Sequence, residues 1–489
     1  MKQFKTMESN MESVNKSVTN CAAMLLAILL SFSAYSQAQS PALVHSRSLA
    51  APGEAGNGFK IRYGGSMGTG SLAGNLMTLR MTAPHGSTVS SITDNLSDSY
   101  TQGVSVDSGS GGWVTAMYYL AGAPAGITQI TVTYSASVAD WHGAVMEYSG
   151  VATSSPVDGT CSNHSTTIAC STAMTTTGAN DLIVASMIGL SGSGTISGNT
   201  MTGVTPGGSF FFDAADTQCS DADEEYVQPS PGSVTPSFTA TGNSESFNIV
   251  GMAFKAANAG TIPTGMYIRR QQHVQFNGPT NSETVYFVSS GNLLLAAADI
   301  GPSSSPVAIS GCTPSNTFTE KTNGTLFPQY FYLTSTANFS TSLHCTVSTT
   351  NQGEHGILVI YDIVGTAASP FDAFGPEGSG SGTVTNTVTP TQGPGIAFGS
   401  ENTGLGPTTG VGGGGFIFDN TPYTGESDGA QLNNGDGWQH YFYTSASEIT
   451  FTWTQANSGS YMQAGAIAFK ASSSPSAPAP PTGLAAAVQ

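Results

Sequence analysis

One stretch of this chain occurs twice, and the repetition limits the possible folds more than any other feature. Residues 144–158 read AVMEYSGVATSSPVD and residues 358–372 read LVIYDIVGTAASPFD, so that the matching prolines are Pro156 and Pro370. The similarity extends to both sides, where segments 118–120 and 331–333 match and segments 253–256 and 468–471 match. The sequence therefore predicts one module that has been duplicated along the chain.

Composition indicates a β-rich protein. The chain has 489 residues, of which 60 are Gly and only 9% are charged, and this mixture does not favour helices. Each module is long enough to bury a core without help from a metal or a disulfide. A net charge of −18 makes nucleic acid and anionic membrane surfaces unfavourable partners.

The amino terminus has the features of a secretory signal peptide. Lys2, Lys5 and Lys16 precede the apolar run 21–30, and the small-residue site Ser-Gln-Ala follows at 36–38. Counted to residue 34, just before Tyr35, the apolar stretch is about 14 residues long, whereas a transmembrane helix needs about 20. We expect cleavage after Ala38, no membrane span after signal removal, and a secreted or cell-surface protein.

Short runs of alternating polarity predict antiparallel sheets. In the first module Ile130, Val132 and Tyr134 alternate with threonines, which places apolar side chains on one face of a strand. Candidate strands of this module are 76–82, 113–119, 127–134, 145–148, 182–187, 210–212 and 247–254, separated by Gly, Ser, Asn and Asp turns. The expected fold class is all-β, with two tandem antiparallel β-sandwich domains at 41–257 and 260–471 and a hinge at 256–260.

Several short motifs resemble a known kind of protein. The opening Gly-Asn-Leu of residues 74–76 returns at 291–293, and together with the duplicated stretch it resembles secreted bacterial β-sandwich repeat proteins of concanavalin-A-like or jelly-roll shape. The resemblance implies a structural repeat and supplies no catalytic residues. Residues 472–489 form a Pro/Ser/Ala-rich linker, and 481–488 resemble the first strand of a fibronectin type III domain. Either the chain is a fragment of a longer protein or these residues are a tail.

Five cysteines remain once the signal peptide and Cys21 are removed, in a compartment that permits disulfides. Cys161 and Cys170 have the spacing of a bridged hairpin or loop. Cys312 and Cys345 lie in two strand-like segments of the second module, and we pair them as a second disulfide. Cys219 is left over, and as no His or basic group near it in sequence would activate its thiol, we interpret it as inert.

Acidic residues gather at corresponding places in the two modules. A shift of 215 residues places Asp213 on Asp428 and Asp221 on Asp436, with Asp223 beside them. Loop carboxylates are ligands that calcium prefers, so a structural calcium is one hypothesis and solvated carboxylates are the other. No other cofactor is expected.

Two groups of residues match catalytic patterns in part. Glu147 with Glu224 or Glu225 would supply the two carboxyl groups of a glycoside hydrolase if their strands were neighbours. However, Glu147 has no counterpart in the second module. The segment 64–68, GGSMG, matches the esterase nucleophile elbow in letters, but that elbow requires a strand-to-helix turn that the pattern does not predict.

Four tryptophans raise the question of sugar binding. Trp113, Trp141, Trp438 and Trp453 would form either a sugar-stacking platform or part of the core, and the alternating strands around Trp113 and Trp453 favour the core. The leading hypothesis is a secreted or cell-surface adhesive protein that binds an extracellular polysaccharide or cell-surface glycan without catalysis. The alternatives are an extracellular carbohydrate-active enzyme and a structural spacer of a larger surface protein.

Overall fold

The structure is a computed structural model that describes residues 40–472 apart from short internal segments. Those segments are 52–55, 139–140, 191–201, 208–209, 217–220, 242–245, 278–281, 289–291, 301–306, 323–328, 335–341, 350–354, 404–407, 411–416, 420–436 and 456–460. Every regular element of the described residues is a β-strand. The described part of the chain accordingly has no helix long and apolar enough to cross a membrane. The expected all-β class is confirmed.

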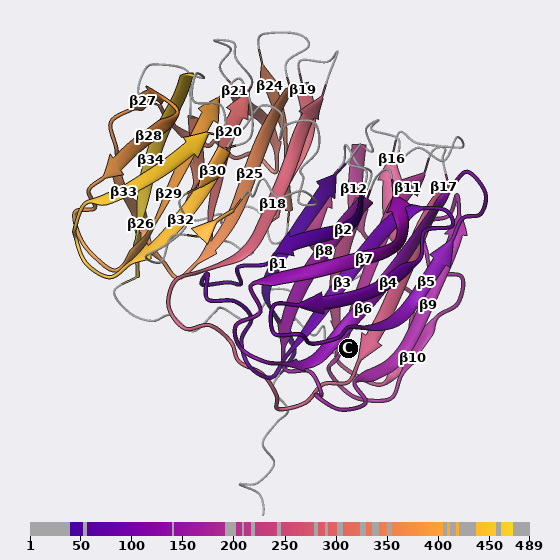
Figure 1. Ribbon diagram of the computed structural model, residues 1–489. Helices are drawn as coiled ribbons and strands as arrows, with labels where there is room; N and C mark the ends of the chain where they lie inside the picture. Colours follow the sequence, from indigo (N-terminus) through magenta and orange to yellow (C-terminus); the bar gives the residue numbers. More distant parts are fainter. Residues whose placement is uncertain are drawn as a thin grey trace, which may run out of the picture. The chain divides into compact units, whose positions relative to one another are not determined.

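A ten-stranded sheet, here called the central sheet, runs through both repeats. Its order is β22 (Thr319–Lys321), β23 (Gln329–Leu333), β20 (Leu293–Ile300), β25 (His355–Val364), β18 (Tyr267–Asn277), β1 (Ala42–Ala51), β8 (Trp141–Ser149), β3 (Asn75–Pro84), β6 (Trp113–Ala123) and β5 (Thr101–Asp107). All neighbouring pairs are antiparallel except β1 and β18, which are parallel, with Ser46 opposite Arg270 and Ser48 opposite Gln272. This pair, visible in Figure 1, joins the first repeat to the second within one sheet.

In the first repeat the central sheet is covered on both faces. One cover is the sheet β2 (Gly56–Arg62), β7 (Gln129–Val138) and β4 (Val89–Asp94), and the other is the sheet β13 (Phe211–Asp216), β14 (Asp221–Gln228), β11 (Asp181–Leu190), β17 (Ser246–Phe254) and β9 (Val157–Ser165). Leu79 and Val132 pack in the first interface, and Tyr148 and Val184 pack in the second. A further layer covers the second sheet and consists of the pairs β10 (Met174–Thr176) with β15 (Gly232–Val234) and β12 (Thr202–Pro206) with β16 (Phe238–Thr241).

The second repeat has the same layers. Its covers are the sheet β19 (Ser282–Val288), β24 (Ser342–Thr349) and β21 (Val307–Thr313), and the sheet β26 (Thr366–Phe374), β34 (Tyr461–Ala471), β29 (Gly395–Thr403), β32 (Gly437–Tyr443) and β31 (Ile417–Phe418), with β27 (Gly378–Ser381) also paired to β34. The last layer is β28 (Thr383–Val388), β33 (Ile449–Gln455) and β30 (Thr408–Gly410). Each repeat is therefore a stack of sheets with several cores.

The residues shared by the two repeats have structural roles. Gly150 and Gly365 both have φ of 79°, and a side chain at either would collide with the segment before β1 or before β18. Further along the duplicated stretch, Asp158 accepts hydrogen bonds from the backbone and hydroxyl of Thr177. Asp372 accepts the same two bonds from Thr391, again 19 residues downstream. The duplicated stretch thus encodes a strand end, a turn and a side-chain link.

The expected hinge is bonded to the first repeat. Gly150 N–H donates to Ala259 O at 2.7 Å, and Ala257 N–H donates to Gly150 O at 2.8 Å. Just beyond it, the amide side chain of Asn75 both accepts from Thr261 N–H and donates to Thr261 O. These contacts tie the linker to the strands that precede it.

Both expected disulfides are confirmed. Cys161 is bonded to Cys170, and Cys312 is bonded to Cys345. Cys219 lies outside the described residues, as do the signal peptide and most of the proposed linker at 472–489. The two disulfides indicate that the protein matures in an oxidising environment.

Removal of the disulfide that closes the longer loop should destabilise the protein more than removal of the other. A bridge constrains the unfolded chain more when it closes a longer loop, and the separations are 33 residues for Cys312–Cys345 and 9 for Cys161–Cys170. We expect losses of about 4 and about 3 kcal/mol for the two double Cys→Ser variants, measured by urea unfolding. Equal losses, or a larger one for the short loop, would contradict this account.

Candidate functional site

Buried carboxylates mark equivalent points of the two repeats. Glu147 in β8 accepts hydrogen bonds from the Tyr63 hydroxyl, from Leu72 N–H at 2.7 Å and from the Asn75 side chain at 2.6 Å. Burial raises the pKa of Glu147, and these donors oppose that rise. Glu147 lies near the end of β8 and has no exposed surface, so it does not face an open cleft.

Asp362 is the counterpart of Glu147, which corrects the expectation that Glu147 has none. Strand register places Glu147 opposite Met77 and Asp362 opposite Leu294, the residues two places after the asparagine of each Gly-Asn-Leu motif. Asp362 accepts bonds from Arg269 at 3.0 Å, Arg270 at 3.1 Å and Asn292 at 3.4 Å. The turn that follows is one residue shorter in the second copy, so the offset between the copies is 215 at Gly150 and Gly365 but 214 at Asp158 and Asp372, and a linear alignment at 214 misses the pair.

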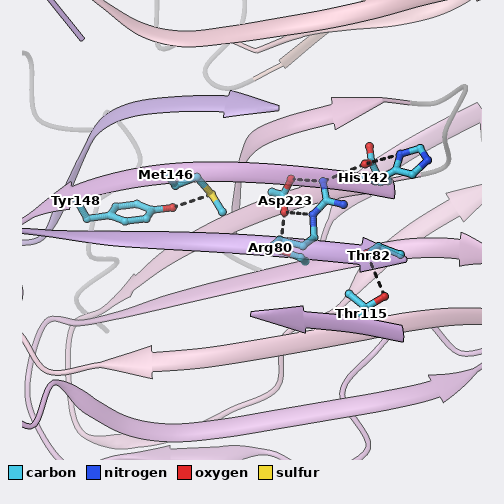
Figure 2. Close-up of polar contacts among 9 residues, drawn as sticks. Arg80, Thr82, Thr115, His142, Met146, Tyr148 and Asp223 are labelled. Atoms are coloured by element: carbon cyan, nitrogen blue, oxygen red, sulfur yellow. Dashed lines mark hydrogen bonds and ion pairs between the residues drawn. The ribbon is translucent and has the colours of Figure 1, made fainter. Parts of the chain in front are cut away.

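A buried ionic cluster lies between the central sheet and β14 in the first repeat (Figure 2). The Arg80 guanidinium donates to Asp223 at 3.0 and 3.1 Å and to Asp221 at 2.9 Å, and Ser186 also donates to Asp223. His142 Nδ1 lies 3.8 Å from the Asp221 carboxylate. All of these side chains are almost fully buried. Burial raises the pKa of Asp223, against the opposing effect of Arg80.

The second repeat fills the same space with apolar groups. Strand register places Ala297 where the first repeat has Arg80, and Trp438 where it has Asp223. The hydroxyl of Ser400, the equivalent of Ser186, donates to Tyr330 at 2.8 Å. The fold therefore does not require the ion pair, and the cluster is specific to the first repeat.

Breaking this cluster should cost more than replacing it. Arg80→Met leaves two carboxylates buried without their cation, so we expect a loss of about 3–5 kcal/mol. The triple variant Arg80→Met/Asp221→Asn/Asp223→Met removes the buried charges and should recover at least half of that loss. Chemical denaturation measures both. A triple variant less stable than the single one would contradict the replacement seen in the second repeat.

His142 should make the protein sensitive to acid. Burial, followed by the charge of Arg80, lowers the pKa of His142 to about 3, so the folded state holds it neutral while the unfolded state protonates near its usual pKa. The contribution of the neutral ring to stability is complete above about pH 6.5 and is lost as pH falls toward 3.

The test compares wild type with His142→Gln. Between pH 7 and pH 4 wild type should lose about 3 kcal/mol more than the variant, because glutamine takes up no proton. Urea unfolding at a series of pH values gives both curves. Parallel curves would show that His142 does not control the acid response.

The proposed glycosidase pair is not brought together. Glu147 points with Met77 toward the β2 sheet, where Tyr63 donates to it. Glu225 lies in β14 on the opposite side of the central sheet, beside Tyr148 and 3.9 Å from Arg270. Glu224 alternates with Glu225 along β14 and so belongs to the far face of that strand. The central sheet thus separates Glu147 from both Glu224 and Glu225. The glycoside hydrolase hypothesis required these carboxylates to lie on neighbouring strands, and they do not.

Two of the calcium candidates, Asp221 and Asp223, are engaged by an arginine within the protein. Asp221 and Asp223 lie in strand β14 and not in a loop, and Arg80 binds their oxygens. Among the described residues, no group of three or more His, Cys, Asp or Glu side chains could hold a metal ion. The side chain of Asp213 and the whole of Asp428 and Asp436 lie outside the described residues, so calcium there stays a prediction.

The tryptophan platform is wrong. All four tryptophans are buried, with exposed fractions of 3% or less, so none offers a face to a sugar. Trp141 and Trp453 pack in sheet-to-sheet cores.

Ser66 of the segment 64–68, which matches the esterase elbow in letters, is fully buried. The loop that contains it continues into strand β3 with no helix, as the sequence pattern indicated.

Polar contacts also cross between the repeats, and sequence patterns gave no sign of them. Arg47 in β1 donates to the Asp419 carbonyl at 2.5 Å, and Asp419 accepts from Tyr361 at 2.8 Å and contacts His440 at 2.8 Å. In the opposite direction, Arg270 of the second repeat lies 3.9 Å from Glu225 of the first repeat. These contacts flank the β1–β18 pair.

A surface groove of about 450 Å³ lies at the end of β14 in the first repeat. Its floor includes Phe210 and Tyr226, whose ring centroids are 5.3 Å apart at an angle of 42°. Gln228 and the hydroxyl-bearing Ser230, Ser233 and Thr235 line its sides, and every lining residue is uncharged. The sequence signal was a turn-rich run, YVQPSPGSVT at 226–235, which carries aromatic, amide and hydroxyl groups together.

No protein-family model matches this chain, and no curated protein matches it either. Among solved structures, the chain is weakly similar to "The Triple Jelly Roll Fold and Turret Assembly in an Archaeal Virus", at 10% identity and a TM-score of 0.14, covering 67% of this chain and 89% of that one. It is also weakly similar to an arabinofuranosyltransferase, AftD, from Mycobacteria, at 9% identity and a TM-score of 0.12, covering 81% of this chain and 38% of that one. Scores this low support no conclusion about fold or function, so the site is interpreted from its own chemistry.

Proposed function

We propose that this protein is a non-catalytic extracellular arm, secreted or held at the cell surface, whose two repeats share one sheet and present binding surfaces. The proposal rests on the hydrogen bonds that protein groups donate to the buried carboxylates. Asp362 and Glu147 each accept three hydrogen bonds from protein groups, and Asp223 is held by Arg80. Carboxylates engaged in this way stabilise the fold and are not arranged as an acid and a base facing a substrate.

Two further observations support the location. The chain carries a signal-like amino terminus, and its two disulfides suit an oxidising compartment. Few residues of the sequence are charged, but the net charge is −18 and Ser and Thr are abundant, which is compatible with solubility outside the cell. The resemblance to secreted bacterial β-sandwich repeats agrees with the same proposal.

The proposal predicts binding without turnover. Incubation with a broad panel of polysaccharides should release no soluble sugar above a buffer control, and Glu147→Gln should behave as wild type does. The same substitution should lower stability by about 1–3 kcal/mol, because the donors around Glu147 lose a charged acceptor. Reducing-end assays and urea unfolding measure the two effects. Sugar release that disappears in the Glu147→Gln or Glu224→Gln variant would establish the enzyme alternative.

A further inference from the structure

We propose that the groove at Phe210, Tyr226 and Gln228 binds a chain of uncharged sugars, with one sugar ring stacked on Tyr226. The proposal rests on the proposed function only in that the ligand is held and not cleaved. It concerns the first repeat alone.

The aromatic floor fits the apolar face of a sugar ring. Tyr226 is partly exposed and lines the groove, whereas Phe210 is only 9% exposed and packs against the Tyr226 ring. Sugar rings present C–H groups on one face, and burying them against an aromatic ring removes apolar surface from water. The tilted contact with Phe210 holds Tyr226 in one orientation before a ligand arrives.

Gln228 supplies a polar group that lacks a protein partner. Its side chain is only 7% exposed, and its Oε1 accepts no hydrogen bond. A buried acceptor without a donor costs about 1–3 kcal/mol, so a ligand hydroxyl that donates to it recovers that free energy. Ser230, Ser233 and Thr235 lie at exposed positions around the opening, where their hydroxyls can both donate to and accept from a sugar.

Charge restricts the ligand to neutral sugars. No lining residue carries a charge that would pair with a carboxylate or a sulfate on a polysaccharide. The chain as a whole has a net charge of −18, which repels polyanions. Uronic acid polymers are therefore excluded, and uncharged hexose or pentose polymers are favoured.

The second repeat shows what this position does when it is not a binding site. Strand register places Tyr443 where the first repeat has Gln228, and Tyr441 where it has Tyr226. The Tyr443 hydroxyl donates to Asp372 at 3.3 Å and to the Phe469 carbonyl at 3.1 Å, so its polar group is satisfied inside the protein. Tyr441 is accordingly a matched control for Tyr226.

The experiment measures retention of the full chain on insoluble cellulose, xylan, mannan and starch, with gel-embedded alginate and pectin as anionic probes. Tyr226→Ala removes the stacking ring, and Ser233→Arg, at an exposed position, fills the groove without touching the core. Tyr441→Ala is the control. We expect retention on at least one neutral polysaccharide, a loss of about tenfold or more in partition for both groove variants, and no change for Tyr441→Ala. Circular dichroism confirms that each variant is folded.

Several outcomes would overturn the proposal. These are no retention on any neutral polymer, retention unchanged in the folded Ser233→Arg variant, an equal loss for Tyr441→Ala, binding restricted to alginate or pectin, or groove-dependent capture of a proline-rich peptide in place of sugar. Failure of the groove would leave the non-catalytic arm standing. Groove-dependent retention with release of soluble sugar would instead support the site and contradict the non-catalytic proposal.

Discussion

The parallel pairing of β1 with β18 is the contact on which the arrangement of both repeats depends. It is the one parallel pair of the central sheet, and it joins the first strands of two equivalent modules. Because each of these strands would otherwise be a sheet edge, the pairing satisfies backbone groups that would be open to another chain. Side chains beside the pair are polar and buried, including His45, Ser46 and Arg47. Two of these side chains reach the other repeat: His45 bonds to the Ile268 carbonyl and Arg47 donates to the Asp419 carbonyl, while Arg47 also donates to the Arg62 carbonyl of its own repeat. The boundary between the repeats is therefore held by specific polar contacts as well as by the sheet.

Comparison of the repeats separates what the fold needs from what one copy has added. Both copies keep a left-handed glycine after the duplicated strand, a buried carboxylate near the Gly-Asn-Leu asparagine, and an aspartate bonded to a threonine 19 residues downstream. Among the residues that the structure describes, the Arg80 cluster and the groove at Tyr226 are found in the first copy. An arginine with two aspartates in one copy and an alanine with a tryptophan in the other occupy equivalent places. Features that differ in this way are where a function particular to one repeat is to be sought.

The sequence predicted the fold class, the duplication and both disulfides, because alternation, repetition and cysteine spacing are local signals. It did not predict the stacked layers, since strands such as β8 are buried along their whole length and show no alternation. Spacing alone allows Glu147 to pair with Glu224 or Glu225, because neither strand order nor the face on which a side chain lies can be read from spacing. The acidic run at β14 was interpreted as a loop, as its cation, Arg80, lies 141 residues earlier than Asp221. The groove was not predicted because the run 226–235 has the composition of an ordinary turn, and Phe210, which contacts Tyr226, comes from an earlier segment of the chain.

The central claim is that the two repeats form one folded unit through β1 and β18. Amide hydrogen exchange followed by mass spectrometry tests it most directly. The account predicts that peptides covering 43–48 and 268–272 are protected as strongly as those of β8 and β25, the antiparallel neighbours of these two strands. Rapid exchange in both segments, with β8 and β25 still protected, would contradict the account and would describe two modules joined only by their linker.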